Sequence, residues 1–282
     1  KSMFSQTLYR LKSISLKWKL LIPFLLFSFI GTTTLVCIGL SSQQNLIRRE
    51  EQKKIQSIYH LFLVEISQKA QQALSLATLI AENPEVQRLL AKRDRKALLD
   101  YTTPWLKRLK DQFGVKQLHF HVPPAKSFLR VHNPQLYGEM ISYRRGVLDV
   151  LKKGKGVAGL EWGLTGLGIR GVAPVYDQKQ LAGSVEIGYP FGHRFLEGLK
   201  KNWGPDLAVY EKRGRDRFAL LAISSRRHEP IEATLDHLNA ALRHPVIVIA
   251  PPSQPECAIL WGPIPDYSGK TAAVAEIDLD RS

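Results

Sequence analysis

The feature that most constrains the fold is an apolar run from Leu20 to Leu40, which holds no charged residue over 21 positions. A helix rises about 1.5 Å per residue, so about 20 apolar residues cross a bilayer core of about 30 Å. The apolar part of a cleaved signal peptide is shorter, about 7–15 residues, and ends at a small-residue cleavage site. Here the run continues into polar helix-forming residues instead. We therefore predict an uncleaved transmembrane helix at residues 20–40.

The charges that flank this run predict its orientation. Residues 1–19 contain five lysines and arginines and no acidic residue. Because basic flanks stay on the cytoplasmic side of a membrane, we expect residues 1–19 in the cytoplasm. Everything after Leu40 then lies outside, and this single span anchors the protein in the membrane.

A long stalk helix is predicted next, over residues 41–82. This segment contains neither proline nor glycine before residue 84, and apolar residues recur at helical spacing between Ile55 and Ile80. A helix of this length cannot bury its apolar stripe alone. We expect it to pack on a downstream domain and to pair with a second copy of itself, which makes a homodimer.

The strong positive charge does not indicate a nucleic-acid partner. The net charge is +15, but the basic residues occur in short, scattered clusters without a recognition helix, a zinc module or an aromatic RNA-binding motif. Solvated loops or attraction to an anionic membrane surface explain the charge better. The two cysteines, Cys37 and Cys257, form no metal, haem or disulfide pattern.

Beyond the stalk, the sequence predicts an α+β class with two tandem modules, at residues 83–200 and 201–282. The first combines short helices, two strands, a helix and a three-stranded meander. Its expected strands are residues 117–122, 127–132, 156–162, 170–176 and 180–189, with a helix at residues 143–153. The second repeats this order on a smaller scale. Its expected strands are residues 206–211, 218–224, 246–250, 258–264 and 271–279, with a helix at residues 231–242.

One predicted strand carries a charge that needs a partner. In the sequence SFLRVH, alternation places Phe128, Arg130 and His132 on one face. A buried arginine without a partner is very unfavourable. The partner is either an anionic ligand, whose carboxylate suits the guanidinium fork, or an internal carboxylate, Glu161 or Glu186.

Several stretches resemble the double Cache sensor class of bacterial chemoreceptors, sensor histidine kinases and diguanylate cyclases. They are HFHVPPAKSFLRVHNPQLYG, the Tyr143–Arg144 pair, GLEWG, LGIRGVAPVYD and LAGSVEIG, all between His119 and Gly188. The resemblance implies two PAS-like antiparallel sheets, with the ligand in the membrane-distal first module. It also implies that the span lies in a bacterial inner membrane with the bulk of the chain in the periplasm, and that a second transmembrane helix and a cytoplasmic signalling region follow Ser282.

The resemblance extends the list of candidate ligand-binding residues. It implies that Tyr143 and Arg144, at the start of a helix, and Arg170, near the start of a strand, converge with Arg130 on one cavity. Glu161 belongs to the same set, and Tyr189 is a candidate hydroxyl donor at the rim. The expected ligand is a small carboxylate or zwitterion, with no cofactor.

Other chemistries find less support. Residues 166–171 match GxGxxG, but a dinucleotide site needs a helix after this motif, whereas VAPVYD is typical of a strand. His119, His121 and His132 lack a further metal ligand at a suitable spacing, so no metal is expected. Glu161 and Glu186 lack a nucleophile or phosphate loop that would make them an acid–base pair. The chain is therefore predicted to sense rather than catalyse. The alternatives are a module that binds another periplasmic protein and a membrane-anchored enzyme.

Overall fold

The computed structural model describes residues 15–164, 166–215, 217–225, 234–251 and 256–281. The chain divides between Lys53 and Lys54 into two compact units. Most of the predicted cytoplasmic segment, residues 1–14, lies outside the described residues. So does the start of the helix predicted at residues 231–242.

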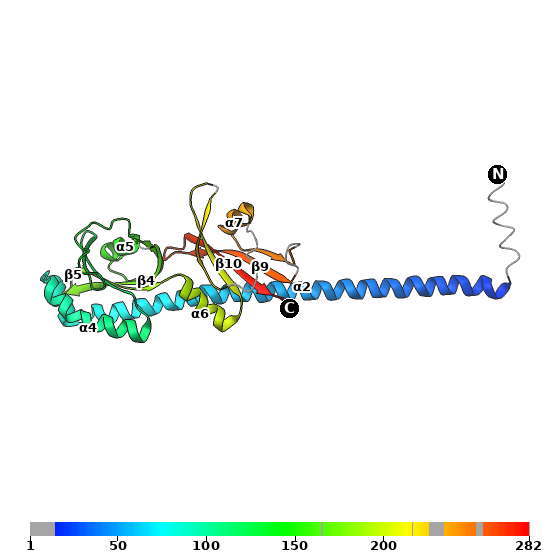
Figure 1. Cartoon of the computed structure of the whole chain (residues 1–282), viewed down its shortest axis with the longest axis horizontal. Helices are drawn as coiled ribbons and strands as arrows, with labels where there is room; N and C mark the ends of the chain where they lie inside the picture. Colours follow the sequence, from blue (N-terminus) through cyan, green and yellow to red (C-terminus); the bar gives the residue numbers. More distant parts are fainter. Residues whose placement is uncertain (1–14, 165, 216, 226–233, 252–255, 282) are drawn as a thin grey trace. The chain divides into compact units, whose positions relative to one another are not determined.

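The first unit contains the apolar part of helix α2, Leu16–Ala81, drawn in blue in Figure 1. Among the described residues, α2 is the helix that is long and apolar enough to cross a membrane, and no part of its most apolar segment is buried. Large side chains are exposed throughout this segment; Phe27, for example, is 81% exposed. Exposure of this kind fits a helix whose apolar surface faces lipid rather than protein.

In the second unit, the remainder of α2 buries the predicted stripe. Ile55 and Phe62 are at most 1% exposed, and Ala73 and Ala77 are fully buried. The stripe joins one continuous apolar core with residues of both sheets. The helix ends at Ala81, where Asn83 begins the next helix by accepting hydrogen bonds from two backbone N–H groups. The prediction that the stripe packs on the downstream domain is confirmed.

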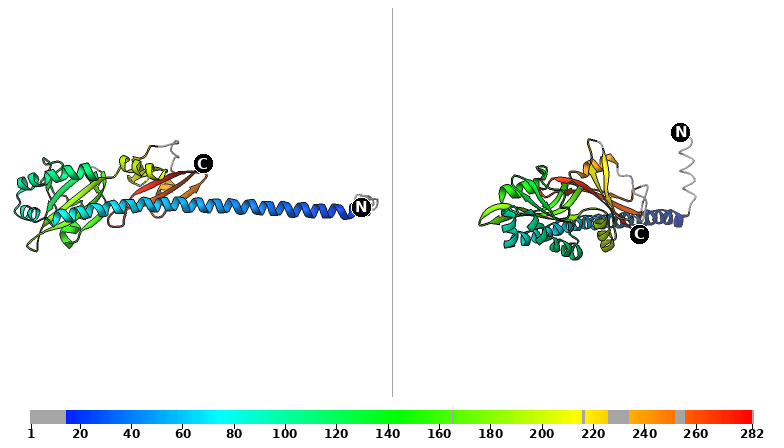
Figure 2. Two further views of the ribbon diagram at one scale, coloured as in Figure 1. Left: turned by 90° about the horizontal axis from the view of Figure 1, so that it is seen from below. Right: turned by 60° about the vertical axis from the view of Figure 1, so that its left-hand side comes forward.

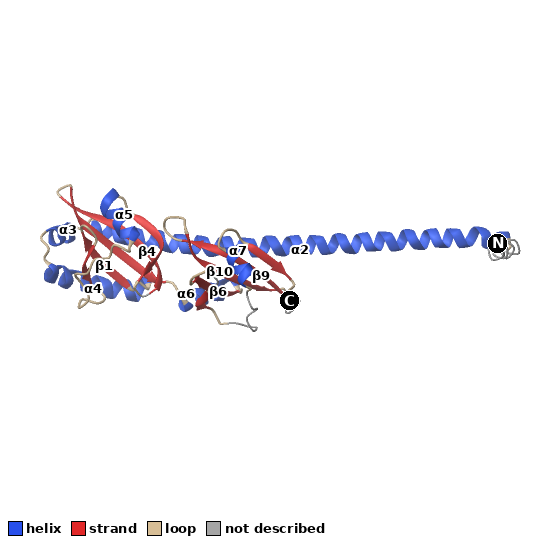
Figure 3. Ribbon diagram, turned by 90° about the horizontal axis from the view of Figure 1, so that it is seen from above, coloured by secondary structure: helices blue, strands red, loops and turns tan. Residues whose placement is uncertain are grey.

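The first module is a five-stranded antiparallel sheet in the order β2-β1-β5-β4-β3. The sheet and its helices are distinguished by colour in Figure 3. The helices are α3 (Pro84–Ala91), α4 (Arg95–Phe113) and α5 (Arg145–Lys153). The strands are β1 (Gln117–Val122), β2 (Lys126–Arg130), β3 (Val157–Gly163), β4 (Gly166–Asp177) and β5 (Gln180–Pro190).

The second module repeats this topology in the order β7-β6-β10-β9-β8. It consists of α6 (His193–Trp203), β6 (Asp206–Lys212), β7 (Phe218–Ile223), α7 (Leu235–Ala241), β8 (Val246–Ile249), β9 (Cys257–Pro265) and β10 (Thr271–Asp280). In both sheets the last strand of the module lies at the centre. The predicted α+β class, with a long helix followed by two antiparallel-sheet modules, is confirmed.

Helix α2 runs along both sheets (Figure 2), and close contacts fix it there. On β4, Gly171 lies so near the helix that an added Cβ would be 2.1 Å from the backbone N of Leu74. On β9, the Tyr59 hydroxyl donates a hydrogen bond to the Pro263 carbonyl at 2.5 Å, and Gly262 leaves room for the Tyr59 ring. Each sheet therefore has one face covered by α2.

A hairpin of the second module also contacts the first module directly. Tyr267, in the β9–β10 turn, donates its backbone N–H to the Leu160 carbonyl of β3 at 3.0 Å. Its hydroxyl lies 3.3 Å from a carboxylate oxygen of Asp149 in α5. Gly159 adopts φ +155°, and a Cβ there would meet the Tyr267 Cα at 2.6 Å. The two modules are thus joined at β3 as well as through α2.

Candidate ligand-binding site

A cavity of about 170 Å³ lies on the face of the first sheet that is turned away from α2. It is formed by the outward side chains of β1 and β4, the end of β2, and the segment that leads into α5. The residues that line it are Gln117, His119, Arg130, His132, Asn133, Leu136, Tyr143, Arg144, Leu164 and Arg170. Three arginines from separate segments therefore meet at one cavity, and each is at most 6% exposed.

Glu186 of β5 lies beneath this cavity and pairs with two of the arginines. Its carboxylate oxygens lie 2.5 Å from Nη2 of Arg144 and 2.6 Å from Nη1 of Arg170. Burial alone would raise the pKa of Glu186, but the two guanidiniums lower it to about 2. This carboxylate is therefore ionised at physiological pH, although the residue is fully buried.

Glu161 of β3 holds the start of α5 in place. One of its oxygens accepts hydrogen bonds from Nε and Nη2 of Arg144 at 3.0 and 2.7 Å. The other accepts the backbone N–H of Gly146 at 2.7 Å, in the first turn of α5. A carboxylate at a helix N-terminus also interacts favourably with the helix dipole. Glu161 therefore positions both Arg144 and the helix.

Arg130 is paired differently, with a loop. Its Nη1 donates to the Leu136 carbonyl at 2.8 Å, and its Nη2 forms an ion pair with Glu139. The Glu139 side chain is 35% exposed, whereas that of Arg130 is 7% exposed. The sequence suggested Glu161 or Glu186 as the internal partner of Arg130, and neither is the observed one. Glu161 pairs with Arg144, and Glu186 pairs with Arg144 and Arg170.

Neutral histidines complete the polar face. His119 hydrogen-bonds Ser127 Oγ at 2.8 Å, and His121 hydrogen-bonds Ser184 Oγ at 3.0 Å. Burial and the nearby positive charges hold the pKa of His119 well below its usual value, and burial lowers that of His121 to about 3. Among the described residues, no group of three or more His, Cys, Asp or Glu side chains is arranged to hold a metal ion.

Glycines make room for the third arginine. A Cβ on Gly163 would lie 2.4 Å from Nη2 of Arg170, and one on Gly168 would lie 3.3 Å from the same atom. The GxGxxG sequence thus lies within strand β4, as the sequence indicated, and Gly168 accommodates a side chain rather than a phosphate. The strand begins at Gly166, four positions before the predicted start, since glycine at φ +104° forms the turn from β3.

The cavity brings together five of the eight predicted site residues: Arg130, His132, Tyr143, Arg144 and Arg170. Glu161 supports it from below through its hydrogen bonds to Arg144.

Phe128 and Tyr189 do not line the cavity. Phe128 is the extra residue of a β-bulge, where the pairing of β1 with β2 skips a position, and it packs against the main core. Tyr189 is 4% exposed and follows Gly188, which is on the cavity face, so its side chain points to the opposite face. There the ammonium of Lys69, in α2, lies 4.2 Å from its ring centroid.

Other cavity residues were not expected as ligand contacts. Gln117 and His119 share a face of β1, and strand alternation could have indicated both. Glu139 lies in a loop after β2, where no periodic pattern relates it to Arg130. Only the folded structure places it.

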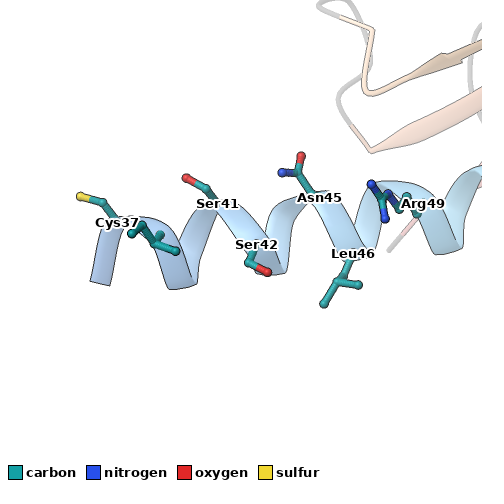
Figure 4. Close-up of a pocket in the computed structure, with 7 residues that line it drawn as sticks. Cys37, Ser41, Ser42, Asn45, Leu46 and Arg49 are labelled. Carbon is teal, nitrogen blue, oxygen red and sulfur yellow. The ribbon is translucent and has the colours of Figure 1, made fainter. Parts of the chain in front are cut away.

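A second hollow follows the surface of α2 in the first unit (Figure 4). It is lined by Cys37, Ile38, Ser41, Ser42, Asn45, Leu46 and Arg49. All of these come from one exposed helix surface, so the hollow has no buried polar group to hold a ligand.

The paired sheets, each in the order 2-1-5-4-3 and joined to one long helix, define a tandem sensory module. The chain belongs to the family described as the double sensory domain of two-component sensor kinases, which it matches over residues 48–243. No curated protein matches significantly.

Solved structures share this fold at low sequence identity. The sensor domain of the Vibrio cholerae histidine kinase DctB is 12% identical with a TM-score of 0.51, covering 82% of this chain and 97% of that chain. A domain of a sensory box/GGDEF family protein from Vibrio parahaemolyticus is 11% identical with a TM-score of 0.51, with the same coverages of 82% and 97%. The periplasmic domain of Vibrio cholerae LuxQ is 10% identical with a TM-score of 0.50, covering 79% and 97%.

Proposed function

We propose that this chain is the extracytoplasmic sensing region of a receptor anchored in the bacterial inner membrane, and that the cavity of the first module binds a small molecule with a carboxylate. The observation that carries this proposal is the convergence of Arg130, Arg144 and Arg170 on one cavity. The forked donors of a guanidinium match a carboxylate, and each of these arginines already pairs with a carboxylate of the protein, which supports recognition of the same group in a ligand.

The size of the cavity limits the ligand. A volume of about 170 Å³ is close to the ~150 Å³ that accommodates benzene, and well below the ~300–1,000 Å³ of sites for drug-sized molecules. We therefore expect a ligand of few heavy atoms, such as a short carboxylic acid or a small amino acid.

Signal transfer would use the packing of the sheet on α2. A ligand on the outer face of the sheet changes the positions of β4 and β5, and the inner face of the same sheet contacts α2 at Gly171 and Tyr189. Because packed cores are bistable rather than continuously deformable, a shift of about 1–2 Å biases a two-state element. Pairing of two copies through α2 would convert this shift into a change between subunits.

The test is thermal stabilisation of the purified chain in detergent by a panel of short monocarboxylates, dicarboxylates and amino acids at matched ionic strength. A ligand present at 100 times its dissociation constant stabilises by about 2.7 kcal/mol. Arg130→Gln should abolish the stabilisation, while Lys126→Gln, which removes an exposed charge from the same strand, should retain it. If no member of the panel stabilises a folded chain, direct sensing of a small carboxylate is wrong.

One observation favours a second candidate, the binding of another periplasmic protein. Leu136 lines the cavity, and Tyr137 and Met140 follow it in the same loop; the three residues are 43%, 55% and 52% exposed. Exposed apolar side chains that lie together are common at protein interfaces. Replacing Tyr137 and Met140, which do not line the cavity, with serine should leave the response to carboxylates unchanged if the cavity itself is the sensor.

A further inference from the structure

Three carboxylates pair with the arginines that line the cavity, and the carboxylate of Glu139 differs in origin from the other two. Glu161 and Glu186 belong to strands β3 and β5, and each has at least two hydrogen-bond donors. Glu139 belongs to the loop between β2 and α5 and pairs only with Arg130 among the ion pairs of the described residues. It is therefore the carboxylate that can leave with the least disruption.

The charges of the site are balanced before any ligand enters. The guanidiniums of Arg130, Arg144 and Arg170 are matched by three carboxylates, and the buried histidines are neutral. An added carboxylate would leave the site with an excess negative charge in a buried setting, which is strongly unfavourable. One of the resident carboxylates must move out for an anionic ligand to bind well.

The loop is built so that the Glu139 side chain can move while its backbone stays. Gly138 donates its N–H to the Ser127 carbonyl at 2.7 Å, and the Ser127 N–H is donated to the Glu139 carbonyl at 2.9 Å. Ile141 donates to the Ala125 carbonyl at 2.9 Å. These bonds hold the loop along β2. The carboxylate oxygens of Glu139 are buried against Arg130, but the side chain as a whole is 35% exposed, so rotation about its torsion angles can carry the carboxylate into water, where its charge is solvated.

We propose that Glu139 is an internal stand-in for the ligand, which neutralises Arg130 in the free protein and is replaced there by the ligand's carboxylate. This inference rests on the proposed binding of a carboxylate in this cavity. Glu139 then determines specificity: an anion can replace it at Arg130, whereas a neutral molecule of the same size cannot. It also sets the affinity, because every ligand competes with it.

The experiment compares the full chain in detergent with its Glu139→Gln variant, using sodium propionate as the probe and sodium chloride to match ionic strength. In chloride, Glu139→Gln should melt several degrees below the parent chain, because Arg130 loses its counter-charge. In propionate this gap should close, and the dissociation constant of propionate should fall by about tenfold. Glu85→Gln removes an equivalent charge from the exposed Glu85–Arg88 pair of α3 and should change neither quantity.

Glu139→Asp separates direct contact from a general charge effect. It keeps the charge but shortens the side chain by one methylene, so it should also tighten propionate binding. Equal propionate affinity in the parent chain, Glu139→Gln and Glu139→Asp would overturn the stand-in role while leaving the proposed function intact. Tightening by Glu139→Gln alone would overturn it too, because only net charge would then matter. Absence of propionate binding by every folded variant would also overturn the stand-in role, whereas the proposed function fails only if no member of the carboxylate panel stabilises the folded chain.

Discussion

Replacing Gly171 with alanine should force α2 away from the first sheet. A Cβ at this position would lie 2.1 Å from the backbone N of Leu74 and 2.4 Å from the carbonyl carbon of Ala73. Ordinary contacts begin near 3.4 Å, so backbone must give way by about 1.3 Å. Neither partner is a flexible side-chain end, and rotation of a torsion angle cannot relieve the overlap.

The expected loss of stability is about 3 kcal/mol, at the upper end of the range for overpacked cores. For a folded unit of this size, each kcal/mol shifts the Tm by about 2–4 °C, so the Tm should fall by about 6–12 °C. Circular dichroism of the purified chain during heating measures this change.

Gly198→Ala provides the matched control. Gly198 lies within α6, and nothing is within 4 Å of its Cβ position. Alanine there should stabilise the helix by about 0.5–1 kcal/mol. If Gly171→Ala unfolds within 1 °C of the parent chain, the close approach of α2 to β4 is not part of the fold in solution.

Three further predictions follow from the site and the contact between the modules. Glu186→Gln leaves two buried guanidiniums short of a counter-charge and should cost about 3–5 kcal/mol in urea unfolding; a loss below 1 kcal/mol would contradict the buried network. The pKa of His121 is about 3 when folded, so its contribution to stability is present above pH 6.5 and is lost as pH falls towards 3. The pKa of Glu186 is about 2, so the stability that this carboxylate contributes is lost as pH falls from 4.5 towards 2. Urea midpoints measured from pH 7 to pH 3 should therefore fall throughout this range. In the His121→Asn variant the midpoints should fall less steeply than in the parent chain. Gly159→Ala should break the Tyr267–Leu160 hydrogen bond and speed hydrogen exchange at the Tyr267 amide, whereas unchanged protection there would argue against the contact.

Much of the fold was predictable because it depends on local periodicity. The helical stripe from Ile55 to Ile80 and the alternating strands identify their own buried faces, since each pattern has a fixed repeat. The end of α2 was predictable for the same reason: Asn83 and Pro84 are strong helix-boundary residues.

The site was less predictable because its partners come from separate parts of the chain. Arg130 could be identified as a charge in need of a partner, but Glu139 reaches it from an irregular loop. Phe128 was assigned to the wrong face because a bulge interrupts the alternation of β2. Tyr189 could have been assigned correctly from Glu186, because residues three positions apart in a regular strand point to opposite faces.

Neighbouring residues of β5 lie on opposite faces of the first sheet. Glu186 pairs with two arginines that line the cavity, and Ile187, directly after it, belongs to the core shared with α2. In the proposed function, ligand recognition and signal transfer would therefore depend on alternate residues of one strand rather than on separate domains. Substitutions on the cavity face of β5 should then alter ligand preference and leave the packing of this strand against α2 unchanged.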